Sequence, residues 1–266
     1  MAEVIIAGLL RKKLVGPEQI VGSHPRQARR EEMHVKYGIE MFESNRETVI
    51  DTQPEGPDDS SIVVLCVKPQ RLHVVLEELK GALVKEQLVV SIVTGAKIET
   101  IAEQLLHASV VRTMPNTPAQ IGEGVTAWTT STEVNEEQES QVCALLDALG
   151  KSVRLENERQ IDMATALSAT GPTYIYLMME ALIDAGVHMG FSRHIAQDLV
   201  HQMILGAVLF ARETHKHPAE LRNMVTSPGG TSAEAIYQME KGSLRTVLSK
   251  AVWAAFQRAE SLGKTI

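Results

Sequence analysis

The chain of 266 residues is poor in aromatic side chains, has only two cysteines and carries an excess of negative charge. Aromatic residues make up 4% of the sequence and hydrophobic residues 44%, so a core must be built mainly from aliphatic side chains and alanine. The formal net charge of −7 argues against a surface that binds nucleic acid or anionic lipid. We therefore expect neither nucleic acid nor a membrane among the partners of this protein.

The two cysteines, Cys66 and Cys143, lie in apolar or helical surroundings, which predicts reduced thiols and argues against a disulfide framework. No cysteines and histidines have the spacing of a zinc site, and His215 and His217 fall in a predicted exposed turn, so we expect no metal. The apolar run at 4–10 is too short to cross a membrane, and positive charges follow it instead of preceding it. It predicts a buried helix, not a signal peptide, and we expect a cytoplasmic protein.

The first half of the chain alternates the patterns of buried strands and amphipathic helices. Apolar runs rich in β-branched residues at 62–67, 88–93 and 110–111 predict strands that are buried on both faces. Apolar residues at helical spacing in 70–81 and 98–106 predict helices between these strands. This order predicts a doubly wound α/β sheet, and a polar stretch at 53–59 predicts a loop between its units.

From about residue 157 the strand patterns stop and long amphipathic helices follow. Gly171-Pro172 should kink the first of them, and the last should break near Gly242. A helical domain this small with so wide an apolar surface is expected to bury part of it in a partner subunit. We predict domains at 1–156 and 157–266, with helices at 159–189, 192–214, 218–225 and 233–262.

The segment 226–232 is expected to be a loop that opens a helix. Pro228 fixes one backbone angle, two glycines permit a tight turn, and Thr231 or Ser232 can cap the helix behind them. A helix start offers unpaired N–H groups and positive partial charge, which suit a carboxylate or a phosphate. An ordinary capped helix start explains the same residues, and the local sequence alone favours that plainer interpretation.

In an open α/β sheet, ligands bind beyond the carboxyl ends of the strands. Lys68-Pro69, Thr94-Gly95 and residues 112–118 follow three predicted strands there, and Asn116 offers a neutral amide. Residues 22–26 follow an earlier strand, where Ser, His and Arg would favour a ribose 2′-phosphate. Lys68-Pro69 can also be a simple strand stop. A solvated helix face is the plainer interpretation of Arg26, Arg29 and Arg30, and it explains Arg29 and Arg30 at least as well as a phosphate site does.

The glycine fingerprint of a dinucleotide-binding domain, Gly-x-Gly-x-x-Gly, follows none of the predicted strands. Met1 falls inside the helix that the fingerprint should open, and the first clear strand, near 19–22, corresponds to the second strand of a complete domain. We therefore expect that roughly ten residues of strand and loop are missing upstream, which a mis-assigned start codon would explain.

Several short motifs occur along the chain in a specific order: Val67 to Pro69, Arg112 to Pro118, Gly122 to Gly124, Gly171 to Tyr174, and His217 to Leu221 leading into Val225 to Thr231. In order and spacing, these motifs resemble those of the pyrroline-5-carboxylate reductase family, from Met1 to about Lys264. The family implies a Rossmann-like dinucleotide-binding domain, here incomplete at its start, and an all-α C-terminal dimerisation domain. It implies the last step of proline biosynthesis, the reduction of L-1-pyrroline-5-carboxylate to L-proline by NADPH or NADH, in a homodimer or a ring of dimers.

The resemblance also implies roles for individual residues. The loop from Ser227 to Ser232 would hold the imino-acid carboxylate, and Thr231 and Ser232 would be the catalytic residues. Ser232 stands where the family usually has a threonine that hydrogen-bonds the ring nitrogen. The substrate-binding residues implied are Ser227, Gly229, Gly230, Thr231 and Ser232. The cofactor-binding residues implied are Ser23, Arg26, Asn45, Val67, Lys68, Pro69, Thr94, Gly95, Met114, Pro115, Asn116 and Thr117.

Two departures from the family pattern leave an alternative open. The first strand and glycine loop are missing, and Ala169-Thr170 stand where the family typically has Gly-Ser. A homologue without catalysis, or with impaired cofactor binding, could keep the dimer fold and bind a small anion or a partner. Within the enzyme class, the substrate could be a different imino acid.

Overall fold

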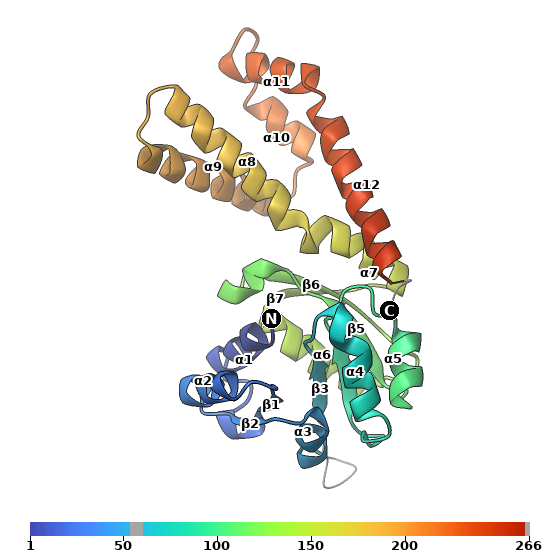
Figure 1. The fold of residues 1–266 in the computed structure, drawn as a ribbon. Coiled ribbons are helices and arrows are strands. Elements are labelled where there is room, and N and C mark those ends of the chain that lie inside the picture. The colour runs from blue at the N-terminus through green and yellow to red at the C-terminus, as the bar shows by residue number, and fades with distance from the viewer. Residues whose placement is uncertain (54–60, 264–266) are drawn as a thin grey trace. The chain divides into compact units, whose positions relative to one another are not determined.

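The computed structural model describes residues 1–53 and 61–263 (Figure 1). Nearly all of the loop predicted at 53–59 lies outside the described residues. Packing divides the chain into two compact units, one formed by Met1–Thr170 with Ala255–Ile266 and the other by Gly171–Ala254. The domains predicted at 1–156 and 157–266 follow the change of sequence pattern, whereas the packing division falls at Thr170.

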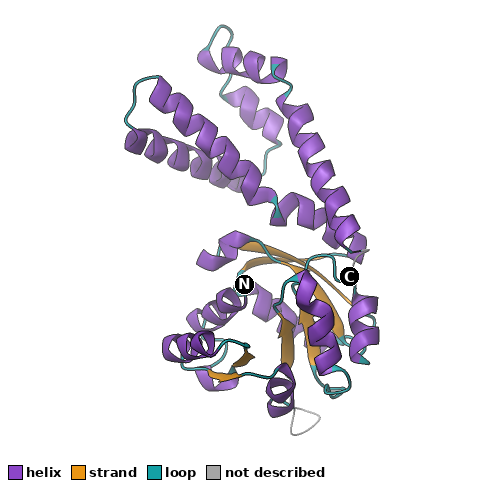
Figure 2. Cartoon of the chain, viewed as in Figure 1, coloured by secondary structure: helices purple, strands orange, loops and turns teal. Residues whose placement is uncertain are grey.

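The main sheet of the first unit has five strands (Figure 2). The first three are parallel, as predicted, and every residue of the second and third is buried. The fourth runs antiparallel to the third, and the fifth is parallel to the fourth; neither of these two was predicted. In sheet order the strands are β3 (Ile62–Leu65), β4 (Leu88–Ser91), β5 (Val110–Met114), β6 (Gly124–Thr130) and β7 (Gly150–Arg154).

Two short strands, β1 (Val21–Ser23) and β2 (Glu40–Phe42), form a separate parallel pair. Helix α1 (Ala2–Arg11) precedes β1, α2 (Gln27–Tyr37) connects the pair, and α3 (Asn45–Asp51) follows β2. The predicted α/β class is confirmed, but a single continuous sheet is not formed. Among the described residues no strand bridges β1 and β3.

Helices cover both faces of the main sheet, as expected for buried parallel strands. Val89 and Val110 face α4 (Pro69–Leu79) and α5 (Ile98–Leu105), while Val90 and Val111 pack in a cluster with α1 and α6 (Glu136–Asp147). Neighbouring residues of one strand thus serve opposite faces of the sheet. The helices predicted at 70–81 and 98–106 are confirmed to within two residues.

The helical part of the chain is interrupted where the sequence predicts. Helix α7 (Glu158–Ala164) runs into a π-helical turn at Thr165–Ala169, and a new helix starts at Gly171, so the helix is interrupted at the place where the kink is predicted. The predicted break near Gly242 is also found, between Lys241 and Leu244. The remaining helices are α8 (Gly171–His188), α9 (Arg193–Thr214), α10 (Pro218–Met224), α11 (Thr231–Lys241) and α12 (Leu244–Leu262).

Candidate functional site

The loop before α11 is an open helix start. Gly230 is extended (φ −80°, ψ 166°) and occupies the position before the first helical residue, and no side-chain hydrogen bond closes the helix. The prediction that Thr231 or Ser232 caps α11 is wrong, because both residues are already inside the helix. Gly229 has a φ of 68°, a conformation that favours glycine, and a Cβ on Gly230 would lie 2.5 Å from the Ser227 hydroxyl, which a side chain there would displace.

Several hydrogen-bond donors of this loop are left without a partner. The N–H of Gly230 donates to the Ser227 carbonyl at 3.1 Å. Within the described part of the chain, no acceptor is found for the backbone N–H groups of Thr231 and Ser232 or for the hydroxyls of Ser227, Thr231 and Ser232. The loop can therefore donate to an anion at no cost in internal hydrogen bonds.

The residues after β3 connect the strand to α4. Lys68 is exposed and immediately precedes the helix, Pro69 is its first residue, and Val67 is half-buried. Proline suits this position because its missing N–H would be unpaired there anyway. The plainer interpretation of Lys68-Pro69, a strand end followed by a helix start, is therefore correct as local structure, and it leaves the Lys68 ammonium exposed.

The loop after β4 is covered by the end of the last helix. Gly95 has a φ of 81°, and a Cβ there would lie 2.9 Å from the backbone nitrogen of Gly263. Phe256 and Ala259 of α12 are buried, 6% and 3% exposed, within the same unit. The backbone of the last turn of α12 thus occupies the space beside Gly95, while Thr94 stays half-buried.

The loop after β5 is held by the amide of Asn116. Its Oδ1 accepts the backbone N–H of Val125 at 2.9 Å, and its Nδ2 donates to the Ser168 carbonyl at 3.2 Å. Asn116 is buried, as are Met114 and Pro115, whereas Thr117 is exposed. The Asn116 amide therefore joins this loop to β6 and to the π-helical turn, and one N–H of its Nδ2 is left for a ligand.

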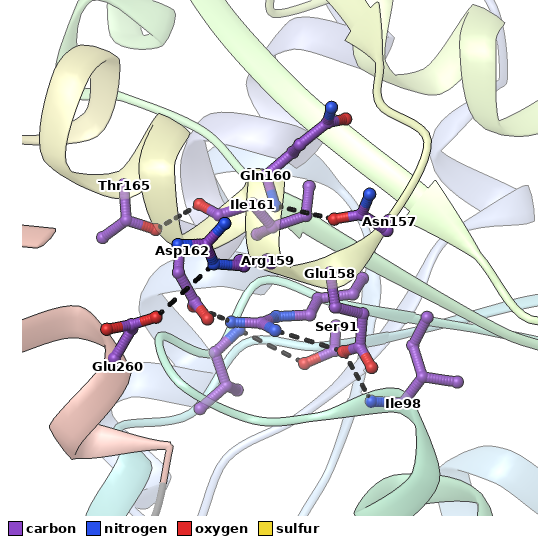
Figure 3. A network of polar contacts seen from close by, with 12 residues as sticks. Ser91, Ile98, Asn157, Glu158, Arg159, Gln160, Ile161, Asp162, Thr165 and Glu260 are labelled. Atoms are coloured by element: carbon purple, nitrogen blue, oxygen red, sulfur yellow. Dashed lines mark hydrogen bonds and ion pairs between the residues drawn. The ribbon is translucent and has the colours of Figure 1, made fainter.

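A buried ionic network lies beside this loop (Figure 3). The Arg112 side chain is 1% exposed and contacts Glu158 Oε1 at 3.1 Å and Asp162 Oδ1 at 2.6 Å. Figure 3 shows both carboxylates on the same side of α7, with Glu158 bonded to the Ile98 N–H. A buried guanidinium is retained only when it is paired in this way.

Ser23 and Asn45 meet each other, but at a different place from Lys68. The Ser23 hydroxyl donates to Asn45 Oδ1 at 2.6 Å, and the Asn45 backbone N–H and Nδ2 donate to the Glu78 carboxylate at 2.9 and 2.7 Å. Burial raises the pKa of Glu78, but these and neighbouring hydrogen bonds lower it further, so that the pKa lies below its usual value. Glu78 lies about 14 Å along α4 from Pro69, at 1.5 Å per residue. The structure therefore does not bring Ser23 and Asn45 to the edge that carries Lys68.

Three arginines follow β1, and the contacts separate them. Arg29 pairs with Glu3 and Glu32, and Arg30 bonds the His24 carbonyl at 2.8 Å. Neither is the freely solvated side chain of the plainer interpretation. Arg26 is exposed, and the described residues give its guanidinium no partner. Burial, followed by the charge of Arg26, lowers the pKa of His24 below its usual value.

Comparison with known proteins places the chain in a family. A model named "NADP oxidoreductase coenzyme F420-dependent" matches residues 1–95, and one named "Pyrroline-5-carboxylate reductase dimerisation" matches 158–262. Pyrroline-5-carboxylate reductase of Synechocystis sp. is 37% identical over 264 residues, which cover 99% of this chain and 95% of the relative. The chain belongs to the pyrroline-5-carboxylate reductase family. The resemblance to this family that the sequence motifs indicate is thereby confirmed.

Solved structures of pyrroline-5-carboxylate reductases have the same fold. The enzyme from Coxiella burnetii matches with a TM-score of 0.87 and 34% identity, covering 98% of this chain and 94% of that one. The Plasmodium falciparum structure, described with NADP bound, matches with a TM-score of 0.86 and 28% identity over 98% of this chain and 94% of that one. The Rossmann-like domain and the helical dimerisation domain predicted from the sequence are thus those of the pyrroline-5-carboxylate reductase family.

Sequence reasoning missed the residues that act through the tertiary structure. Arg112 lay within a motif that was recognised, but the partners Glu158 and Asp162 carried no local signal. The contacts of Glu78 with Asn45 and of Gly263 with Gly95 join residues far apart in the chain. An open cleft of about 920 Å³, bordered by the starts of α5 and α7 and the end of β6, contains no predicted site residue.

Proposed function

We propose that this protein reduces L-1-pyrroline-5-carboxylate to L-proline with NADPH or NADH, the last step of proline biosynthesis. Relatives of that name, 31–38% identical over nearly the whole chain, support the proposal. The structural observation that carries it is the open start of α11, with its unpartnered backbone and hydroxyl donors. A small carboxylate is the ligand that such a helix start suits.

The chemistry asks little acid–base work of the protein. The substrate is a cyclic imine that is reactive when protonated, and reduction adds a hydride to its C=N carbon while the π electrons move to nitrogen. In our proposal the N–H groups of Thr231 and Ser232 and the Ser227 hydroxyl hold the carboxylate, and Gly229 and Gly230 let the backbone come close. The Ser232 hydroxyl bonds the ring nitrogen, so Thr231 and Ser232 orient the reacting carbon.

A nicotinamide cofactor supplies the hydride when bound. The loops after β3, β4 and β5 follow the carboxyl ends of three neighbouring parallel strands, which fits the nicotinamide half. The residues proposed there are Val67, Lys68, Pro69, Thr94, Gly95, Met114, Pro115, Asn116 and Thr117. Ser23 and Asn45 are proposed at the ribose with Arg26; here their side chains bond to each other and to Glu78, and these bonds would have to be exchanged for bonds to the cofactor.

The unpartnered guanidinium of Arg26 supports NADPH as the preferred cofactor, because a ribose 2′-phosphate would give it a counter-charge. Arg26→Ala is expected to lower kcat/KM for NADPH about tenfold, the loss of one charge-assisted hydrogen bond, and to leave NADH almost unchanged. Steady-state rates with each cofactor measure this. An equal loss with both would remove Arg26 from the phosphate site.

We also propose that the protein is a homodimer or a ring of dimers in the cytoplasm. The matched dimerisation model and the exposed apolar residues of the helical unit support the assembly. The two free cysteines are compatible with a reducing compartment.

The function is tested by NADPH oxidation that depends on pyrroline-5-carboxylate. Two proteins are compared: this chain, and the same chain with a β-strand and a Gly-x-Gly-x-x-Gly loop added before Met1. We expect turnover by at least the second, because that strand would have the unpaired edges of β1 and β3 as neighbours. No turnover by either protein would overturn the proposal and favour the binding-only homologue.

Ser232→Ala tests the substrate loop in whichever form is active. We expect kcat/KM to fall about 10- to 100-fold with an unchanged melting temperature, since the hydroxyl has no partner among the described residues. Thr214→Ala is the matched control, because that hydroxyl bonds the Phe210 carbonyl at 2.8 Å and lies outside the loop. It should leave the rate unchanged. An unaffected rate in Ser232→Ala would exclude Ser232 from catalysis.

A further inference from the structure

Arg112 connects β5 to α7 just before the loop proposed to face the nicotinamide. Its guanidinium is divided between two carboxylates, Glu158 and Asp162, which lie one turn apart on α7. Because each carboxylate takes a different terminal nitrogen, the guanidinium fixes the rotation of α7 as well as its distance from β5.

The first carboxylate also ties down the start of α5. Glu158 Oε1 accepts both Arg112 Nη1 and the Ile98 backbone N–H, the latter at 2.9 Å. Ile98 is the first residue of α5 and follows the loop that contains Thr94 and Gly95. A single carboxylate oxygen therefore links the loop after β4 to the strand that leads into the loop after β5.

The second carboxylate leads back to the same loop by another route. After Asp162, α7 continues into the π-helical turn, where the Ser168 carbonyl accepts Asn116 Nδ2 at 3.2 Å. Asn116 Oδ1 in turn accepts the Val125 N–H. The loop is thus held from α7 at two points, directly before it by Arg112 and within it by Asn116.

We propose that Arg112 is a positioning residue for cofactor binding and hydride transfer. It clamps α7 to β5 and so holds Asn116 and the start of α5 in the geometry that receives the nicotinamide. This rests on the proposed function. Arg112 itself touches neither substrate nor cofactor in this proposal; it acts through Glu158, Asp162 and Asn116.

A variant of the neighbouring residue, Val111, distinguishes a positioning role of Arg112 from a purely structural one. Val111 is also buried in β5, but it belongs to the cluster on the opposite face of the sheet and does not contact α7 through the clamp. Val111→Ala should lower the melting temperature and leave KM for NADPH unchanged. Arg112→Lys keeps the charge but replaces the planar fork by one ammonium group, which cannot reproduce both contacts.

For Arg112→Lys, we expect KM for NADPH to rise about tenfold and kcat/KM to fall about 100-fold, the scale of a small misplacement near reacting groups. Amide exchange of the protein without cofactor should become faster at Ile98 and Val125, whose N–H groups report the two tethered loops. Equal KM values in Arg112→Lys and Val111→Ala, measured where both are folded, would overturn the proposal.

A double variant keeps the test decisive if single variants are unstable. Arg112→Met with Asp162→Leu replaces the buried ion pair by apolar side chains, an exchange that often preserves stability. We expect its melting temperature to recover while KM and amide exchange stay raised. Recovery of the melting temperature, KM and amide exchange together would show that Arg112 only stabilises the fold, and would overturn the proposal. If neither this chain nor its extended form oxidises NADPH, the proposed function fails, whereas unchanged exchange at Ile98 and Val125 would overturn the clamp alone.

Discussion

The two units of this chain bury their apolar residues to very different degrees. In the first unit, strands such as β4 and β5 are fully buried between helices. In the second, Ile183 and Ala196 are buried, but Leu209 and Phe210 of α9 are each 50% exposed. Both units have the amphipathic patterns of folded proteins. The first satisfies its pattern within one chain, and the second requires a further surface to cover it.

Helix α9 shows what the difference means. By length and composition it is the one helix of the described residues that could cross a membrane, and only 11% of its most apolar window is buried. It lies within the segment matched by the dimerisation model. We therefore interpret its exposed apolar residues as the contact surface for a partner subunit, and each prediction below tests this contrast between the units.

The largest effect is expected for charges on α9. Leu205 and Leu209 lie four residues apart on one face and are 52% and 50% exposed. Leu205→Glu with Leu209→Glu should weaken dimerisation by at least about 100-fold, since burying unpaired carboxylates costs several kcal/mol. Light scattering over a dilution series measures this.

Val35→Glu serves as the control for the α9 variant. Val35 is 85% exposed on α2 of the first unit, where no partner is proposed, and its change should leave the dimer intact. A dimer that is insensitive to the α9 charges would show that another surface covers the second unit.

A smaller effect is expected for Gly95→Ala, which adds one methyl group in the first unit. It should lower the free energy of unfolding by about 3 kcal/mol, because the methyl group combines a left-handed backbone with a collision against the Gly263 backbone. Gly81→Ala is the matched control: its φ is 67° and nothing lies within 4 Å, so about 1 kcal/mol is expected. Denaturant unfolding measures the free energy of unfolding of both variants. Equal decreases in the two would mean that the end of α12 does not pack closely against Gly95.

The smallest effect is expected for the same substitution in the second unit, and with the opposite sign. Nothing within the subunit lies within 4 Å of a Cβ at Gly206 in α9. Gly206→Ala should therefore stabilise the protein by about 1 kcal/mol through helix propensity. Thermal unfolding at several concentrations measures it, and a concentration-dependent loss instead would place a partner helix against Gly206.

Periodicity and turn chemistry were enough to predict much of the fold. The helix interruptions at Gly171-Pro172 and near Gly242, and the strands β3 to β5, follow from local preferences that tertiary contacts do not override. Strand β6 was not predicted, because its direction depends on pairing with β5, a contact between segments that local patterns do not encode.

The candidate site divides in the same way. The composition of 226–232 predicts a loop, and that is found. The expected side-chain cap is absent because α11 already begins at Thr231, which leaves Gly230 at the capping position. The sheet edge predicted to carry residues 22–26 together with Lys68 did not form as one edge, because β1 and β3 lie in separate sheets, and Asn45, which the resemblance assigns to the cofactor, bonds Glu78. Strands β1 and β2 form a separate pair, and the first turn of α3, which comes directly after β2, binds the Glu78 carboxylate.

By itself, the sequence determined the class of this protein: an α/β unit followed by helices, the family, and the loop that is proposed to hold a carboxylate. These follow from residue order, spacing and local backbone preference. Only the tertiary structure decided that Arg112 pairs with Glu158 and Asp162, that Gly263 packs against Gly95, and that Glu78 accepts hydrogen bonds from Asn45. Each joins residues distant in the chain, which local sequence patterns do not encode, and burial of the Arg112 side chain, 1% exposed, strengthens its ion pairs by removing competing water.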